Sequence, residues 1–104
     1  MIKTALLVKL QAKKGKEKEV EKFLQEALSN VEDEPATATW YAVRFDAGSY
    51  GIFDTFPDEN GRQEHLSGKV AKALKEKSGE LFSGPPAIEK LDVLAAKMPE
   101  VAQY

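Results

Sequence analysis

Three side chains that can donate or accept protons stand close together in this 104-residue sequence: Tyr41, Asp54 and His65, the last being the only histidine. A carboxylate beside an imidazole orients the ring and favours its protonated form, an arrangement that is common in general acid–base catalysis. If a helix begins near Asp58, His65 lies about two turns along it, roughly 10 Å from the end of the preceding strand. A helix packed back across the sheet then brings His65 over the strand that supplies Asp54. We therefore expect a direct or water-bridged contact between Asp54 and His65, either as a catalytic pair or as a structural bond.

A tight hairpin is expected to position the acid and the phenol. Two segments rich in β-branched and aromatic residues flank the turn sequence Asp46-Ala47-Gly48-Ser49, which is typical of a β-hairpin. With a two-residue loop at the centre of this turn, the predicted opposite pairs are Phe45 with Tyr50, Val43 with Ile52, Tyr41 with Asp54, and Thr39 with Phe56. Strand side chains alternate in direction, so these eight share one face, while Trp40 and Phe53 point to the other.

Hydrophobic periodicity predicts the first half of the chain. Residues 2–12 alternate in polarity as a strand does, and from Lys16 the spacing changes to that of a helix, which Pro35 stops. The apolar stripe of this helix is formed by Val20, Phe23, Leu24, Ala27, Leu28 and Val31.

The second half supplies one more helix and one more strand. Residues 59–77 have a weaker helical pattern that Gly68 interrupts, and Asp58 is a plausible N-cap. Residues 87–98 predict a fourth strand. The order β-α-β-β-α-β is that of the ferredoxin-like α+β fold, a four-stranded antiparallel sheet with both helices on one face. We expect one domain over residues 1–98 and a C-terminal tail over 99–104.

Composition excludes several classes of function. The net charge of −2 gives no basic surface for nucleic acid, and no apolar run reaches the roughly 20 residues of a membrane-spanning helix. With no cysteine and one histidine, the chain cannot form a thiolate metal site or a multi-histidine metal site. We expect a cytoplasmic protein without a nucleic-acid or membrane partner.

Both faces of the predicted hairpin are apolar, which indicates a homodimer. The helices can cover only one face, and Trp40 and Phe53 on the other would lie in water unless a second sheet covers them. Packing of two sheets face to face in a symmetric dimer is the simplest solution. The long fourth strand, residues 87–98, is expected to cross to the partner.

Short motifs spread over residues 1–98 resemble those of the antibiotic biosynthesis monooxygenase superfamily, the dimeric α+β barrel proteins. The motifs are Lys14-Gly15-Lys16 at the start of the first helix, Glu34-Pro35 before the second strand, Asp54-Thr55-Phe56 at the end of the third, Asp58, and His65-Leu66. Members of the superfamily commonly carry Glu and Trp where this chain has Asp54 and Phe56. The resemblance implies the ferredoxin-like dimeric fold, whereas the activities known in this superfamily differ widely.

The resemblance also allows haem degradation to be weighed and rejected. Haem-degrading members have an Asn in the first strand, a Trp early in the second helix, and an iron-binding His about three turns further along. Here the first strand has no Asn, His65 stands at the Trp position, and the ligand position falls near Lys75. A protonated lysine has no lone pair to offer iron, and we expect no cofactor.

The remaining activity that the resemblance implies is that of a cofactor-independent monooxygenase. Such an enzyme would bind a small aromatic or quinol-type compound between the sheet and the helices and oxygenate it. In this interpretation Asp54 and His65 are catalytic, Tyr41 and Arg44 hold substrate oxygens, and Phe56 and Phe82 line the apolar walls. The predicted register, however, places Arg44 on the face opposite Tyr41. A non-catalytic, ligand-binding or stress-related dimer of the same fold is the alternative. Trp40 is expected to be an interface or core aromatic rather than a substrate platform.

Overall fold

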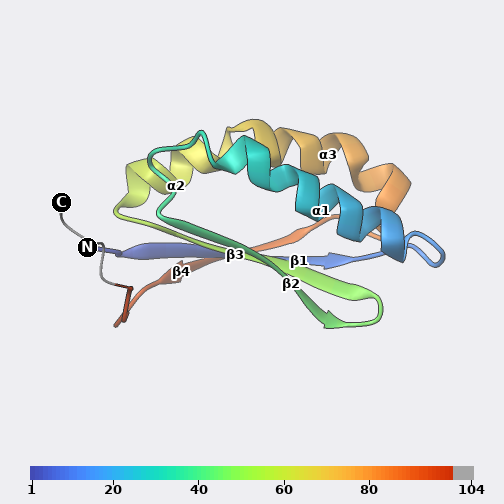
Figure 1. The fold of residues 1–104 in the computed structure, drawn as a ribbon, viewed down its shortest axis with the longest axis horizontal. Coiled ribbons are helices and arrows are strands. Elements are labelled where there is room, and N and C mark those ends of the chain that lie inside the picture. The colour runs from blue at the N-terminus through green and yellow to red at the C-terminus, as the bar shows by residue number, and fades with distance from the viewer. Residues whose placement is uncertain (100–104) are drawn as a thin grey trace.

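A four-stranded antiparallel sheet carries all the helices on one face (Figure 1). The computed structural model describes residues 1–99, and the strand order is β2-β3-β1-β4. In chain order the elements are β1 (Thr4–Gln11), α1 (Glu17–Val31), β2 (Thr39–Asp46), β3 (Ser49–Phe56), α2 (Glu59–Leu66), α3 (Lys69–Leu81) and β4 (Ala87–Asp92). The predicted α+β, ferredoxin-like fold is confirmed, with the second helix divided in two.

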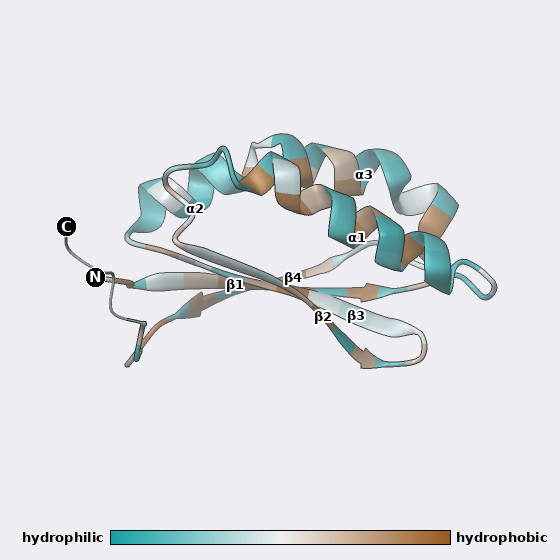
Figure 2. Cartoon of the chain, viewed as in Figure 1, coloured by the Kyte–Doolittle hydropathy of each residue, from teal (hydrophilic) through white to brown (hydrophobic). Residues whose placement is uncertain are grey.

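The first helix is held to the sheet by its apolar stripe. Its buried residues recur at helical spacing: Val20, Leu24, Ala27 and Val31. Figure 2 shows hydrophobic residues on the sides of α1 and α3 that face the sheet and hydrophilic residues on the outer sides. This amphipathic pattern lets the two helices and the sheet enclose one core.

A break at Ser67 and Gly68 divides the region predicted as one helix over 59–77. The Ser67 hydroxyl donates to the carbonyl oxygens of Gln63 and Glu64, and Gly68 has an extended backbone at the N-cap of α3. Glycine is a poor helix former, so the chain turns here and starts a new helix. The predicted N-cap of α2 is confirmed, because the Gly61 amide donates to Asp58 Oδ1 at 2.9 Å.

The fourth strand is shorter than the predicted 87–98. β4 ends at Asp92, which pairs with Thr4, the first residue of β1. Since β1 begins at Thr4, β4 has no residues of β1 left to pair with beyond Asp92. Only the Val93 amide continues the pattern, by donating to the Lys3 carbonyl. Residues 93–99 form no strand within this chain, so the predicted bounds 87–98 are too long for the sheet of one chain, and the crossing to a partner stays a prediction. The remainder of the predicted tail, 100–104, lies outside the described residues.

The hairpin has the predicted turn but a different register. Asp46 lies opposite Ser49, as a two-residue loop requires, but the register shifts between Arg44 and Asp46 because Phe45 bulges out of the pairing. Trp40 therefore lies opposite Asp54, and Tyr41 lies opposite Phe53. The predicted pairing of Tyr41 with Asp54 is wrong. A one-residue shift sends a side chain to the other face of the sheet.

The shift exchanges the faces of the sheet on which Trp40 and Tyr41 were predicted to lie. Trp40 faces the helices, half-buried against the core, whereas the prediction placed it on the open face. Tyr41 and Phe45 lie on the open face with 56% and 58% of their surface exposed. Phe53 lies on the open face as predicted, since it alternates with Asp54, whose side chain meets a helix.

None of the helices within residues 1–99 has both the length and the apolar composition needed to cross a membrane. The cytoplasmic location expected from the sequence stays a prediction.

Candidate functional site

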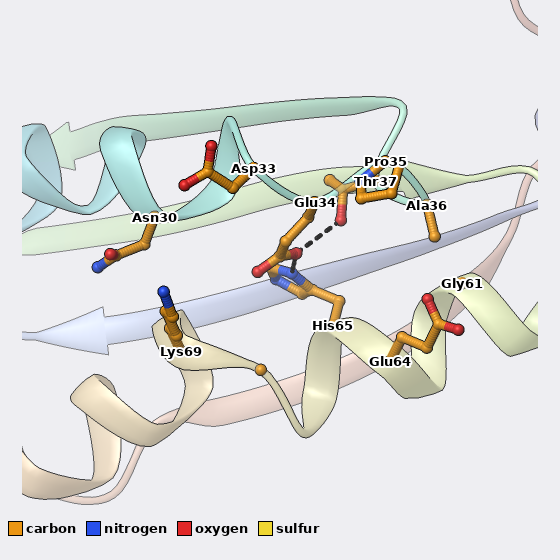
Figure 3. Close-up of a pocket in the computed structure, with 11 residues that line it drawn as sticks. Asn30, Asp33, Glu34, Pro35, Ala36, Thr37, Gly61, Glu64, His65 and Lys69 are labelled. Carbon is orange, nitrogen blue, oxygen red and sulfur yellow. Dashed lines mark hydrogen bonds and ion pairs between the residues drawn. The ribbon is translucent and has the colours of Figure 1, made fainter.

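His65 lies near the C-terminal end of α2, between the carboxylates of Asp54 and Glu34. Its Nε2 atom lies 2.7 Å from Asp54 Oδ2, and its Nδ1 atom lies 2.6 Å from Glu34 Oε1. Figure 3 shows Glu34 reaching the ring from the loop that follows α1. Asp54 has no exposed surface and His65 has 6%, whereas the Glu34 side chain is 19% exposed. We call Glu34, Asp54 and His65 the carboxylate–histidine cluster.

Three separate elements position the cluster. Asp54 lies near the end of β3 with its side chain toward the helices, and the Asp58 cap starts α2 so that His65 passes above it. Glu34 belongs to a turn after α1, in which the Thr37 amide donates to the Glu34 carbonyl. The Thr37 hydroxyl also donates to Glu34 Oε1 at 2.8 Å, which fixes the carboxylate toward the ring.

The pKa of His65 is raised above its ordinary value. Burial acts to lower this pKa, but the bonds to Asp54 and Glu34 outweigh burial and favour the charged ring. In the imidazolium form both ring nitrogens are donors, and each has a carboxylate in front of it. The histidine in this state has no free lone pair with which to accept a proton.

Each acid of the cluster has a carboxylate oxygen that accepts no hydrogen bond in the described part of the chain. Within residues 1–99, Asp54 Oδ1 and Glu34 Oε2 are buried without a hydrogen-bond donor. The short contact of Asp54 Oδ2 with His65 is a close ion pair rather than a well-aligned hydrogen bond. A buried acceptor without a donor is unusual in a folded protein, and each of these oxygens keeps a lone pair that can accept a proton.

Two cavities meet at His65. One, of about 570 Å³, lies between α3 and the sheet and is mostly apolar; its lining includes Leu6, Val8, Ile52, Leu66, Val70, Ala71, Leu74, Pro85, Pro86 and Ile88. The other, of about 260 Å³, has charged and polar residues in its lining, among them Glu34, Asn30 and Lys69 (Figure 3). His65 is the one residue that lines both. The larger cavity has the size and lining of a small-molecule site.

The structure brings together three of the residues expected from the sequence. Asp54 and His65 are in direct contact, as expected. The ring of Phe56 is fully buried and lies 5.4 Å from the His65 ring between centroids. The catalytic role of the pair stays a prediction.

The other three expected residues lie elsewhere. Tyr41 projects from the open face of the sheet. Arg44 forms an exposed ion pair with Glu21 at 3.3 Å, and Phe82 packs edge-on against Phe23 with centroids 6.5 Å apart. None of the three lines the large cavity. The register shift at Phe45 accounts for Tyr41.

A buried tyrosine shares the carboxylate that Arg44 binds. The Tyr50 hydroxyl donates to Glu21 Oε2 at 2.7 Å, and burial together with this bond raises the pKa of Tyr50 to about 12. This phenol therefore stays neutral near pH 7 and ties β3 to α1.

Sequence reasoning missed Glu34 as a member of the site. Glu34 was noted as the acid of the Glu34-Pro35 step, but nothing in the spacing pointed it toward His65. The signal that could have found it is the combination of an acid, a proline and Thr37, which forms a tight turn capable of presenting a carboxylate. Within residues 1–99, no three histidine, aspartate or glutamate side chains are arranged to bind a metal ion.

The chain is similar to several solved structures, although no protein-family model and no curated protein matches it. A protein of unknown function from Nitrosomonas europaea is 46% identical, with 97% of this chain and 98% of that chain covered and a TM-score of 0.95. A candidate antibiotic biosynthesis monooxygenase from Caulobacter crescentus is 22% identical, covers 90% and 92%, and has a TM-score of 0.77. A second such protein, from Chloroflexus aurantiacus, is 13% identical, covers 92% and 97%, and has a TM-score of 0.71.

These likenesses define the class of the protein. Its fold is shared with the candidate antibiotic biosynthesis monooxygenases from Caulobacter crescentus and Chloroflexus aurantiacus, which is the fold that the sequence motifs indicated. The chain belongs to the same family as the Nitrosomonas europaea protein of unknown function. At their low identities the Caulobacter and Chloroflexus proteins establish the fold alone.

Proposed function

We propose that this protein binds a small, flat aromatic or quinol-type molecule in the 570 Å³ cavity and oxygenates it without a bound cofactor. The observation that carries the proposal is the apolar cavity whose lining includes His65, the histidine of the carboxylate–histidine cluster. Apolar walls with few polar groups are what an aromatic ligand requires. The shared fold with the candidate antibiotic biosynthesis monooxygenases from Caulobacter and Chloroflexus supports oxygenase chemistry as the proposal.

The cluster can take up the proton of a ligand hydroxyl. One imidazolium between two carboxylates carries a net charge of −1, and one more proton brings that charge to zero. The proton leaves the phenolic oxygen, the electron pair of the O–H bond stays on the ligand, and Asp54 Oδ1 or Glu34 Oε2 holds the proton. Neither carboxylate lines the large cavity, so the His65 ring has to move before a ligand hydroxyl can reach one of them from it.

The resulting anion is the reductant for molecular oxygen. A deprotonated hydroxyaromatic ring is electron-rich at carbon, and O₂ adds there to form a hydroperoxide. Loss of water from the hydroperoxide leaves a quinone carbonyl, so one oxygen atom enters the product and the other leaves as water. The ligand is oxidised by four electrons in total, and no external reductant is needed. The protein contributes binding, deprotonation and exclusion of bulk water.

A second candidate function is ligand binding without catalysis. Both nitrogens of His65 are already engaged by carboxylates, which is also what a purely structural clamp requires. In that case the cavity holds an aromatic molecule and the cluster only fixes α2 to the sheet.

Oxygen uptake with a series of hydroxynaphthalenes and quinols tests the two functions. We expect the wild-type protein to bind the compounds and consume one O₂ per ligand, and Asp54→Asn to slow consumption by at least about tenfold because the cluster loses one of its two proton-accepting carboxylates. The matched control is Glu64→Gln, which lines the polar cavity but makes no bond to His65. Binding without oxygen uptake would favour the second function. Failure to bind any compound would overturn both.

We also propose that the functional unit is a homodimer formed by the open faces of two sheets. Tyr41, Val43 and Phe45 expose 56%, 38% and 58% of their surface on this face, and such a cluster of large apolar side chains is typical of an interface. Sedimentation at micromolar concentration is expected to give about twice the chain mass of 11.5 kDa. Tyr41→Glu should give a monomer, and Tyr41→Phe should not. A wild-type monomer would overturn the proposal.

A further inference from the structure

We infer that the ligand of the large cavity carries a negatively charged group at the end away from His65, and that Lys75 binds this group. The inference rests on the proposed function, because it concerns the ligand of the same cavity. It adds a substrate class, an anionic hydroxyaromatic compound, and a residue that selects it.

The charges around the cavity are unequal. No aspartate or glutamate is among its lining residues, whereas His65 and Lys75 both line it. The protein as a whole is acidic, with a net charge of −2. Within residues 1–99, the cavity lining therefore contains basic side chains and no acidic ones, although the protein as a whole is acidic.

Only one of the two positive charges is free to attract an anion. His65 is neutralised by Asp54 and Glu34, so this end is net negative and favours a neutral hydroxyl donor. Lys75 makes no ion pair within residues 1–99. The positions three and four residues away in α3 hold no acid, whereas Lys77 pairs with Glu80.

His65 and Lys75 line the large cavity from two different helices. Lys75 lies six residues into α3, roughly 9 Å along the helix, and the Ser67-Gly68 link adds to its distance from His65. The floor between them is apolar, formed by Leu6, Val8 and Ile52. Ser78 lines the cavity one turn after Lys75 and adds a hydroxyl donor at the same end. A molecule of two or three fused rings spans this length, with its hydroxyl at His65 and its anionic group at Lys75.

Two fluorescent probes of matched shape test the inference. N-phenyl-1-naphthylamine is neutral, and 8-anilinonaphthalene-1-sulfonate has the same ring skeleton with a sulfonate. We expect the sulfonate probe to bind about fivefold to tenfold more tightly at low salt, and the preference to shrink as salt screens the charge. Lys75→Gln should remove the preference and leave the affinity for the neutral probe unchanged. Lys72→Gln, on the same helix but outside the cavity lining, is the matched control.

A cavity-filling variant separates the possible failures. Ala71 lines the cavity, and Ala71→Trp should abolish binding of both probes if they bind there. If the neutral probe does not bind, or if Ala71→Trp has no effect, the proposed cavity function fails and the inference fails with it. If the neutral probe binds in the cavity but the sulfonate gives no preference, or the preference survives Lys75→Gln, the inference alone is overturned.

Discussion

Nδ1 of His65 lies 2.6 Å from Oε1 of Glu34, and this bond joins α2 to the loop after α1. The same ring contacts Asp54 on β3 through its other nitrogen. One side chain thus holds a helix, a loop and a strand together. The protonation of this ring can be followed without interference from another imidazole, because the chain has no other histidine.

Replacement of either carboxylate should lower the pKa of His65. Asp54→Asn or Glu34→Gln removes one negative neighbour that favours the imidazolium, while the burial that opposes it remains. NMR titration of the lone histidine measures the change, and Glu64→Gln is the control. An unchanged pKa in both variants would mean that the cluster does not form in solution. If His65→Ala lowers the melting temperature but leaves ligand binding and oxygen uptake unchanged, the cluster is structural.

The stability of the protein should fall as the pH rises above about 6.5. The pKa of His65 is raised in the folded state, so the folded chain keeps a proton that the unfolded chain loses near its ordinary pKa of about 6.5. The stabilisation is fully present below that pH. It is lost at up to about 1.4 kcal/mol per pH unit as the pH rises through the folded pKa. Urea unfolding at several pH values should show this slope, and His65→Gln should remove it; an equal slope in both proteins would contradict the assignment.

Trp40→Ala should destabilise the fold itself, by about 3 kcal/mol, because the Trp40 ring packs against the core and its removal leaves a cavity. Tyr41→Ala should act differently, since Tyr41 lies on the open face. Its effect on urea unfolding should depend on protein concentration, as loss of a dimer contact requires. Equal and concentration-independent effects of the two substitutions would contradict the observed register.

Gly51→Ala should destabilise the hairpin by roughly 1–3 kcal/mol. A Cβ at position 51 would lie 2.9 Å from Cε2 of Phe45 and 3.2 Å from the Val8 carbonyl oxygen. Phe45→Ala removes the first contact but not the second, so the double variant should recover part of the loss. Thermal unfolding of the two single variants and the double variant measures this coupling. Additive losses would show that the Phe45 ring does not lie over Gly51.

The order of the elements could be predicted because each element carries its own local pattern. The stripe of α1, the turn at Ala47 and Gly48, and the cap at Asp58 are all encoded within a few residues. The break at Ser67 and Gly68 was harder to place, since Gly68 alone also fits a continuous but weakened helix.

The register of the hairpin could not be predicted in the same way. Both faces of β2 carry apolar residues, so alternation does not say which of Trp40 and Tyr41 faces the helices. The register is determined at Phe45, which does not pair with a residue of β3 and places its ring over Gly51. Glu34 escaped prediction for a related reason: its contact with His65 depends on the docking of α2 over the α1–β2 loop, which no local pattern describes.

The carboxylate–histidine cluster and the walls of the large cavity come from different segments of the chain. Glu34, Asp54 and His65 lie in the α1–β2 loop, β3 and α2, whereas most of the wall belongs to α3 and to Pro85, Pro86 and Ile88. Substitutions in the wall can therefore change which molecule fits without disturbing the three groups that we propose to take up the ligand proton. After gene duplication, two copies could diverge in the compounds that they accept and still inherit the same acid–base chemistry.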